Sequence, residues 1–170
     1  MADKIILVTG GQRSGKSQFS ETLALKYSKT PVYVATAHIA DDEFRERVRL
    51  HRERRGPNWG SIEEEIELSR HDMTGKTALV DCVTMWITNV FFSHNEDRDL
   101  SLKLLKDEFD RFTAKAGTFI FVSNEIGSGV IPGDAMTRKF VDLQGWFNQY
   151  IASRADEVYL TVAGIPIKVK

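Results

Sequence analysis

One short segment, VTGGQRSGKSQ at residues 8–18, restricts the fold of this chain more than any other. The pattern G-x-x-x-x-G-K-[ST] is matched in full by Gly10, Gly15, Lys16 and Ser17. A hydrophobic run at residues 5–8 precedes the segment, and a helical pattern at residues 16–28 follows it. In this strand, loop and helix order the glycines let backbone N–H groups surround an anion, and the helix N-terminus adds positive potential. A glycine-rich turn without a ligand is the simpler alternative, and the pattern and its context together favour a phosphate site.

The residue types around this segment suggest what the phosphate site does. Lys16 would reach the β- and γ-phosphates of a nucleotide, and the Ser17 hydroxyl would be a ligand of Mg²⁺. Asp81 ends the hydrophobic run TALVD, either as a second magnesium ligand or as the cap of the next helix, and the phosphate site favours the metal role. Gln12 and Arg13 lie at the crest of the loop, where Arg13 either meets phosphate or packs outward.

Hydrophobic runs and helical patterns alternate along the chain. Strands are expected at residues 5–8, 32–35, 78–80, 119–122 and 158–162, with a sixth in GIPIKVK. Helices are expected at residues 16–28, from Asp41 or Asp42 to about Arg55, at 61–64 from a capping box, at 83–92 as a buried helix, and along the apolar stripes 102–112 and 136–147. This alternation predicts a mostly parallel sheet flanked by helices, with an antiparallel edge strand at the C-terminus.

Composition limits the class of protein. The chain has 170 residues, so we expect a single domain over residues 1–170. Its formal net charge of −1 argues against nucleic-acid binding, which normally needs a basic excess. No apolar run approaches about 20 residues, so no membrane span is expected. Cys82 is the single cysteine, which precludes an internal disulfide and fits a reducing cytoplasm.

The segment FRERVRLHRERR, residues 44–55, carries six arginines and two glutamates. His51 shares one helical face with Phe44 and Val48. One interpretation is a solvated basic helix with a half-buried histidine. The other is an imidazole nucleophile among cations that hold polyphosphate, kept unprotonated by the nearby positive charge. Spacing alone leaves both open.

Several longer segments together carry a more specific signal. They are GGQRSGKSQFSE, YVATA, the His51 segment with Trp59, DCVTMWITN, SNEIGSGVIP, GWFNQ, ADEVYL and GIPIKVK. Over about residues 5–170 the chain resembles the bifunctional adenosylcobinamide kinase / adenosylcobinamide-phosphate guanylyltransferase family of cobalamin biosynthesis. The resemblance implies a RecA-like P-loop NTPase fold, Mg²⁺ as cofactor, and a homotrimer with a site partly formed between subunits.

Two reactions follow from the resemblance. The first phosphorylates the aminopropanol hydroxyl of adenosylcobinamide with ATP or GTP. The second transfers GMP from GTP to that phosphate through a covalent GMP–histidine. The matching nucleophile is His51, whereas His38 falls in a variable turn and His71 and His94 lie outside the motif.

The family pattern also selects a set of nucleotide contacts. They are Gly10, Gly11, Gln12, Arg13, Ser14, Gly15, Lys16, Ser17, Ala35, Thr36, Ala37, Arg52, Glu53, Arg54, Arg55, Glu63 and Asp81. Glu64 and Glu65 adjoin Glu63, so a shift of one residue stays open there. The loop SNEIGSGVIP is expected near the corrinoid or the nucleotide, with Asn124 and Glu125 facing the site.

The chain departs from the family at one position. Where the family has an arginine before an aspartate, this chain has Val141 before Asp142, and Arg138 and Lys139 are close enough to substitute.

Two other functions compete with the leading one. A single-function P-loop kinase of another small alcohol would use Lys16, Ser17 and Asp81 but leave the His51 segment idle. A nucleotide-sensing switch or assembly ATPase would share the fold.

Overall fold

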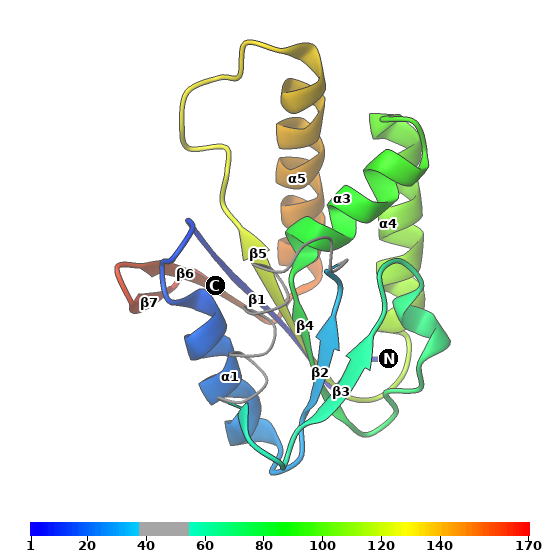
Figure 1. Cartoon of the computed structure of the whole chain (residues 1–170). Coiled ribbons are helices and arrows are strands. Elements are labelled where there is room, and N and C mark those ends of the chain that lie inside the picture. Colours follow the sequence, from blue (N-terminus) through cyan, green and yellow to red (C-terminus); the bar gives the residue numbers. More distant parts are fainter. Residues whose placement is uncertain (38–54) are drawn as a thin grey trace.

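The computed structural model describes residues 1–37 and 55–170, and this part of the chain forms one seven-stranded sheet (Figure 1). The strands are β1 (Lys4–Gly10), β2 (Val32–Ala35), β3 (Gly60–Glu63), β4 (Thr77–Asp81), β5 (Thr118–Asn124), β6 (Glu157–Val162) and β7 (Ile165–Lys168). Their order across the sheet is β3-β2-β4-β5-β1-β6-β7. All neighbouring pairs are parallel except β6 and β7, which are antiparallel. The predicted fold class, with its antiparallel C-terminal edge strand, is confirmed.

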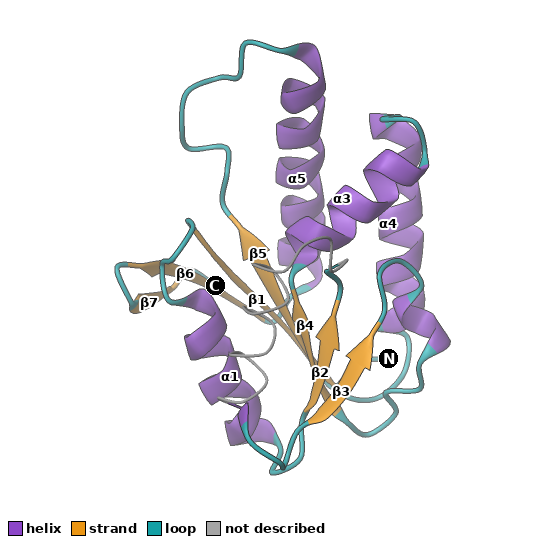
Figure 2. Cartoon of the chain, viewed as in Figure 1, coloured by secondary structure: helices purple, strands orange, loops and turns teal. Residues whose placement is uncertain are grey.

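Helices cover both faces of this sheet (Figure 2). They are α1 (Lys16–Tyr27), the short 3₁₀ helix η1 (Leu68–Arg70), α3 (Val83–Ser93), α4 (Arg98–Phe112) and α5 (Ala135–Arg154). α1 packs on one face against β1, β4 and β5, and α3 and α5 pack on the opposite face with α4 against them. The helix expected from Asp41 or Asp42 falls mostly in residues 38–54, which lie outside the described residues.

The central strands β1, β4 and β5 each have a continuous apolar segment because both of their faces are covered. In β1, Ile5 and Leu7 join the core beneath α3, α4 and α5, whereas Ile6 and Val8 join the core beneath α1. Phe119 and Ile120 divide in the same way in β5. Alternate side chains of a strand point to opposite faces, so a continuous hydrophobic run serves two cores at once.

The helix expected from Ser61 and Glu64 is wrong. Residues 60–63 form β3, which pairs in parallel with β2, so a backbone ladder takes precedence over the local capping signal. Glu64 does cap, but it caps the turn that leads to η1: its Oε1 accepts hydrogen bonds from the N–H groups of Ile66 at 3.1 Å and Glu67 at 3.0 Å. Burial opposes ionisation of this carboxyl, but these bonds and His71 outweigh it and hold the pKa of Glu64 below its usual value.

The helix α3 is less buried than its apolar sequence suggests. Its sheet-facing side is fully covered at Trp86, Ile87 and Phe91, whereas Phe92 on the outer side is 51% exposed. The remaining expected elements are present, although α5 continues seven residues beyond the expected stripe, to Arg154. Among residues 1–37 and 55–170, every helix is too short or too polar to cross a membrane.

Glu157, the first residue of β6, links β1, β6 and β7 through its carboxylate. Its carboxylate pairs with the Lys4 ammonium of β1, accepts from the Tyr159 hydroxyl at 2.5 Å, and lies 3.5 Å from the Lys168 ammonium of β7. The hydrogen bonds from Lys4 and Tyr159 lower the pKa of Glu157 to about 2. The ionised carboxylate therefore stabilises the attachment of β6 and β7 to the rest of the sheet.

This pairing predicts a pH-dependent stability difference. Glu157→Gln is expected to lower the free energy of unfolding by about 1–2 kcal/mol near neutral pH. Because the folded-state pKa is depressed, the wild-type advantage is complete above the ordinary value of 4.5 and disappears as the pH falls toward about 2. Urea unfolding of both proteins from about pH 7 to about pH 3 measures it. A difference that stays constant across that range would contradict the assignment.

Candidate active site

The carboxyl ends of β1, β2, β4 and β5 lie at one edge of the sheet, where the loops that follow them emerge (Figure 1). β5 lies between β1, which leads into the phosphate loop (residues 10–17), and β4, which ends at Asp81. Open parallel sheets bind ligands at this edge because successive loops converge there. The candidate site is therefore built across three adjacent strands.

The phosphate loop turns tightly between β1 and α1. Gly15 adopts a left-handed conformation with φ of 93° directly before the helix, and the Ser14 N–H donates to the Gly11 carbonyl oxygen at 3.3 Å. The Lys16 ammonium reaches back across the loop and donates to the Gly11 carbonyl oxygen at 3.0 Å. The first N–H groups of a helix have no partner inside the helix, so the start of α1 offers donors to an anion. Gln12 and Arg13 are exposed at the crest.

The turn between β6 and β7 packs directly onto this loop and explains two of its glycines. A Cβ on Gly10 would lie 2.5 Å from the Thr161 Oγ1, and a Cβ on Gly15 would lie 3.0 Å from the Gly164 Cα. The hydroxyls of Ser14 and Thr161 are hydrogen-bonded at 2.8 Å, and the Gly164 N–H donates to the Ser14 carbonyl oxygen at 2.8 Å. The C-terminal hairpin therefore supports the shape of the phosphate loop.

Lys16 and Asp81 form the charged pair of the site. Lys16 is only 9% exposed, and burial lowers the pKa of its ammonium, an effect that the negative charge of Asp81 opposes. A charge is worth more in such surroundings than in water because the local dielectric constant is lower. The lysine is thus held by burial where it can meet a phosphate.

A second cluster supports Asp81 from the α1 side of the sheet. Tyr33 pairs with Leu79 in the β2–β4 ladder and so shares a face with Asp81, whose carboxylate acts electrostatically on the Tyr33 hydroxyl. Burial and the adjacent charge of Asp81 raise the pKa of Tyr33 well above its usual value, so it stays a neutral donor. The Arg55 guanidinium lies 3.4 Å from the centre of the Tyr33 ring and 3.9 Å from the Glu21 Oε1.

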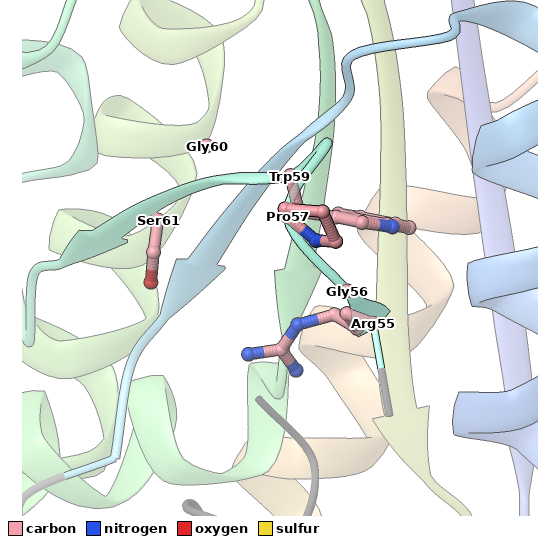
Figure 3. Close-up of a pocket in the computed structure, with 6 residues that line it drawn as sticks. All are labelled: Arg55, Gly56, Pro57, Trp59, Gly60 and Ser61. Atoms are coloured by element: carbon pink, nitrogen blue, oxygen red, sulfur yellow. The ribbon is translucent and has the colours of Figure 1, made fainter. Parts of the chain in front are cut away.

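Arg55 also borders a pocket of about 290 Å³ next to the first residues of β3 (Figure 3). Its side chain is only 4% exposed, and its Nη1 has no hydrogen-bond partner among the described residues. The pocket is lined by Arg55, Gly56, Pro57, Trp59, Gly60 and Ser61. A buried guanidinium N–H without a hydrogen-bond partner in the described part of the chain is suited to donate to a ligand oxygen.

Of the nucleotide contacts expected at Ala35, Thr36 and Ala37, Thr36 has its side chain in hydrogen bonds to a neighbouring segment. The Thr36 hydroxyl donates to the Cys82 carbonyl oxygen at 2.7 Å and accepts from the Cys82 N–H at 2.9 Å, and the Thr36 carbonyl accepts from Asn89 at 2.7 Å. Thr36 therefore locks the segment after β2 to the start of α3. Ala35 ends β2, and Ala37 follows at the same edge.

The position of Glu63 makes it a better candidate than Glu64 for the acidic nucleotide contact. Glu63 ends β3 level with Ala35, which in turn is level with Asp81, so it belongs to the same edge and is exposed there. Glu64 instead caps the turn to η1 and contacts His71 at 3.2 Å. The two described carboxylates of the predicted set, Glu63 and Asp81, thus lie at the ends of β3 and β4.

The end of β5 approaches the phosphate loop. The Glu125 N–H donates to the Gly10 carbonyl oxygen at 2.9 Å, which extends the β1–β5 ladder by one bond. The Asn124 N–H donates to the Thr84 hydroxyl oxygen at 3.1 Å, and the Asn124 carbonyl oxygen accepts from the Asn148 side-chain amide at 3.2 Å. One carboxylate oxygen of Glu125 accepts from the Gly127 N–H at 2.7 Å, so this oxygen shapes the following loop.

The remaining predicted residues divide into two groups. His51, Arg52, Glu53 and Arg54 lie outside the described residues, as does His38. His71 and His94 are described, and both make local contacts, to Glu64 and to the Val90 carbonyl oxygen at 2.8 Å. Val141 lies on α5, and Arg138 on the same helix donates to the carbonyl oxygens of Pro132 and Gly133.

Sequence reasoning missed Tyr33, Glu21 and Thr161. Tyr33 and Glu21 stand within the quoted segments YVATA and GGQRSGKSQFSE, but neither was assigned a role. Their roles depend on which strand lies beside β4 and on what packs against the loop, and no local pattern signals either.

Comparison with known proteins places the chain among related sequences. The model of the family described as "Cobinamide kinase / cobinamide phosphate guanyltransferase" matches residues 6–169. The bifunctional adenosylcobalamin biosynthesis protein CobP of Pseudomonas aeruginosa is 38% identical, with 96% of each chain covered. The bifunctional adenosylcobalamin biosynthesis protein CobU of Escherichia coli is 35% identical, covering 98% of this chain and 99% of the relative.

One solved structure supports the fold. An ATPase from the type III secretion system of pathogenic bacteria superposes with a TM-score of 0.52 at 14% identity, covering 92% of this chain and 50% of that one. At this identity the likeness concerns the fold alone, and it agrees with the RecA-like class expected from the sequence.

The Tyr33–Asp81 contact predicts a separable effect on the site. Tyr33→Phe removes the hydroxyl but keeps the ring beneath Arg55, so Asp81 loses a neighbouring polar group. We expect nucleotide affinity in the presence of Mg²⁺ to fall about three- to tenfold, the range for the loss of one polar interaction with a charged group. Titration with a fluorescent GTP analogue measures it. Tyr159→Phe is the matched control, since its hydroxyl serves Glu157 instead, and equal losses in both variants would refute the assignment.

Proposed function

Since the chain belongs to the cobinamide kinase / cobinamide phosphate guanyltransferase family, we propose that it carries out both reactions on adenosylcobinamide. It is a transferase that first phosphorylates the hydroxyl of the aminopropanol arm with ATP or GTP. It then transfers GMP from GTP to that phosphate and yields adenosylcobinamide-GDP. The observation that carries the kinase step is the buried Lys16 beside Asp81 at the phosphate loop.

In the kinase step the substrate hydroxyl oxygen forms a bond to the γ-phosphorus, while the bond from that phosphorus to the β–γ bridging oxygen breaks. The products are a phosphate ester and a nucleoside diphosphate, and the hydroxyl proton passes to water. Charge accumulates on the phosphoryl oxygens, where the Lys16 ammonium and the N–H groups at the start of α1 stabilise it. Positioning and electrostatics supply most of the rate enhancement in this reaction class.

Ser17 and Asp81 are suited to hold Mg²⁺ in this step. Both supply oxygen, the ligand type that Mg²⁺ prefers, and the Asp81 charge acts on Lys16, the residue next to Ser17. In the described part of the chain no three His, Cys, Asp or Glu side chains gather at one point, so phosphates and water would complete the coordination. When bound, the ion neutralises phosphate charge.

The guanylyl step uses His51 as the nucleophile. Its imidazole nitrogen forms a bond to the α-phosphorus of GTP, and the bond to the α–β bridging oxygen breaks to release pyrophosphate. An oxygen of adenosylcobinamide phosphate then attacks the same phosphorus and frees the histidine. The cations around His51 stabilise both transition states, and Arg55 is their one described member, held by Tyr33 and Glu21.

Two properties of the whole enzyme complete the proposal. We place it in the cytoplasm as a homotrimer, with each site partly formed by a neighbouring subunit. Several exposed apolar side chains support association, among them Phe92, Trp146, Ile165 and Val169.

Burial raises the pKa of the Cys82 thiol to about 11, so it stays a neutral, unreactive thiol in the cell.

The kinase assignment predicts a large loss in Lys16→Ala. Phosphorylation of adenosylcobinamide should fall by about a hundredfold or more, because the transition state loses a charge held in place by burial. The measurement is corrinoid-dependent release of nucleoside diphosphate. Lys26→Ala, in the last turn of α1, is the matched control and should keep its activity. Wild-type rates in the Lys16 variant would refute the assignment of the phosphate loop.

The guanylyl assignment predicts a labelled protein. Incubation with α-labelled GTP should leave acid-labile label on the denatured wild type and none on His51→Ala, while the variant keeps its kinase activity. His94→Ala serves as the control histidine. Absence of label on the wild type would instead favour a single-function kinase. Equal loss of both activities in His51→Ala would mean that the histidine acts structurally.

A further inference from the structure

The loop between β5 and α5 exposes three aliphatic side chains to solvent. Val130 is 97% exposed, Ile131 is 81% exposed and Ile126 is 37% exposed. The segment arches beyond the end of the sheet before it joins the start of α5 (Figure 1). Exposed apolar groups gathered in this way mark a binding surface. We call residues 126–131 the apolar rim.

The apolar rim is held in shape by polar bonds at both of its ends and not by burial of its own side chains. On the β5 side, the Gly127 N–H and the Ser128 hydroxyl donate to one Glu125 oxygen at 2.7 and 3.3 Å. On the α5 side, the Arg138 guanidinium donates to the Pro132 and Gly133 carbonyl oxygens at 3.0 and 2.6 Å. The aliphatic groups are therefore presented outward by a braced backbone.

The position of the rim ties it to the reaction. It continues β5, the strand between the phosphate loop and Asp81, and the Glu125 N–H is bonded to the Gly10 carbonyl oxygen. A substrate hydroxyl that meets the terminal phosphate must approach across this edge. The macrocycle that carries the hydroxyl is too wide for the phosphate loop, so it must rest on the surface next to it.

We propose that the apolar rim is the docking surface for the corrin macrocycle of the acceptor substrate, an inference that rests on the proposed function. The ligand chemistry fits: the edge of a corrin carries methyl and methylene groups, and its side chains in cobinamide are neutral amides. Residues 126–133 carry no charged side chain. Val130 and Ile131 supply apolar contact, while the glycine- and serine-rich backbone at 127–129 offers hydrogen bonds to the amides.

The test replaces the two most exposed aliphatic groups by serine in the full-length protein, as Val130→Ser/Ile131→Ser. The matched control is Leu25→Ser/Leu100→Ser on the outer sides of α1 and α4, where the two side chains are 49% and 42% exposed. Three quantities are measured: the KM for adenosylcobinamide with its direct binding by equilibrium dialysis, the Kd for GTP, and the molar mass in sedimentation.

We expect the rim variant to raise the KM and the dissociation constant for adenosylcobinamide at least about tenfold. Its Kd for GTP and its molar mass should match the wild type, and the control variant should keep its corrinoid affinity. An unchanged corrinoid affinity in the rim variant would overturn the inference. A fall in molar mass would also overturn it, because the rim would then be a contact between copies of the chain. A wild type that binds GTP but never phosphorylates adenosylcobinamide would refute the proposed function itself.

Discussion

The parallel pairing of β1 with β5 and β6 is the constraint on which the rest of the site depends. β1 lies inside the sheet, and its side chains enter two cores, so its end cannot shift without disturbing both. The ladder brings Gly10 against Thr161 so closely that a Cβ would lie 2.5 Å from the threonine hydroxyl. The phosphate loop therefore starts from a fixed point and is braced by the hairpin at the far end of the chain.

Electrostatics then turn this edge into a site. Lys16 and Arg55 interact with Asp81 and Glu21 in surroundings from which most water is excluded, and the neutral hydroxyl of Tyr33 interacts with the charge of Asp81. Buried charges are tolerated when each has a partner, and their orientation is then already set before a ligand arrives. The same network links the kinase residues at β1 and β4 to Arg55, which follows the segment that carries His51. The two proposed reactions would thus share one charged scaffold.

Much of the fold was predictable because its signals are local. Continuous apolar runs such as those around Ile6 and Ile120 identify strands that are buried on both faces, and the stripe on α4 identifies a helix lying on a core. The prediction failed at Ser61, where a capping pattern occurs in a strand. That strand exists because its backbone pairs with β2, and pairing between segments distant in the sequence leaves no short pattern.

The sequence by itself determined the phosphate loop, the strand that ends in Asp81 and the family of the chain, because these reside in short motifs whose chemistry needs particular residue types. Only the tertiary structure decided that β5 lies between the phosphate loop and Asp81 and that Tyr33 lies on the same face as this carboxylate. It also decided that the Thr36 hydroxyl is hydrogen-bonded to the Cys82 backbone and that Val130 and Ile131 stand exposed in the loop that follows β5. The reason is physical: strand order and packing follow from burying apolar surface over the whole chain at once, and that balance is not written in any one segment.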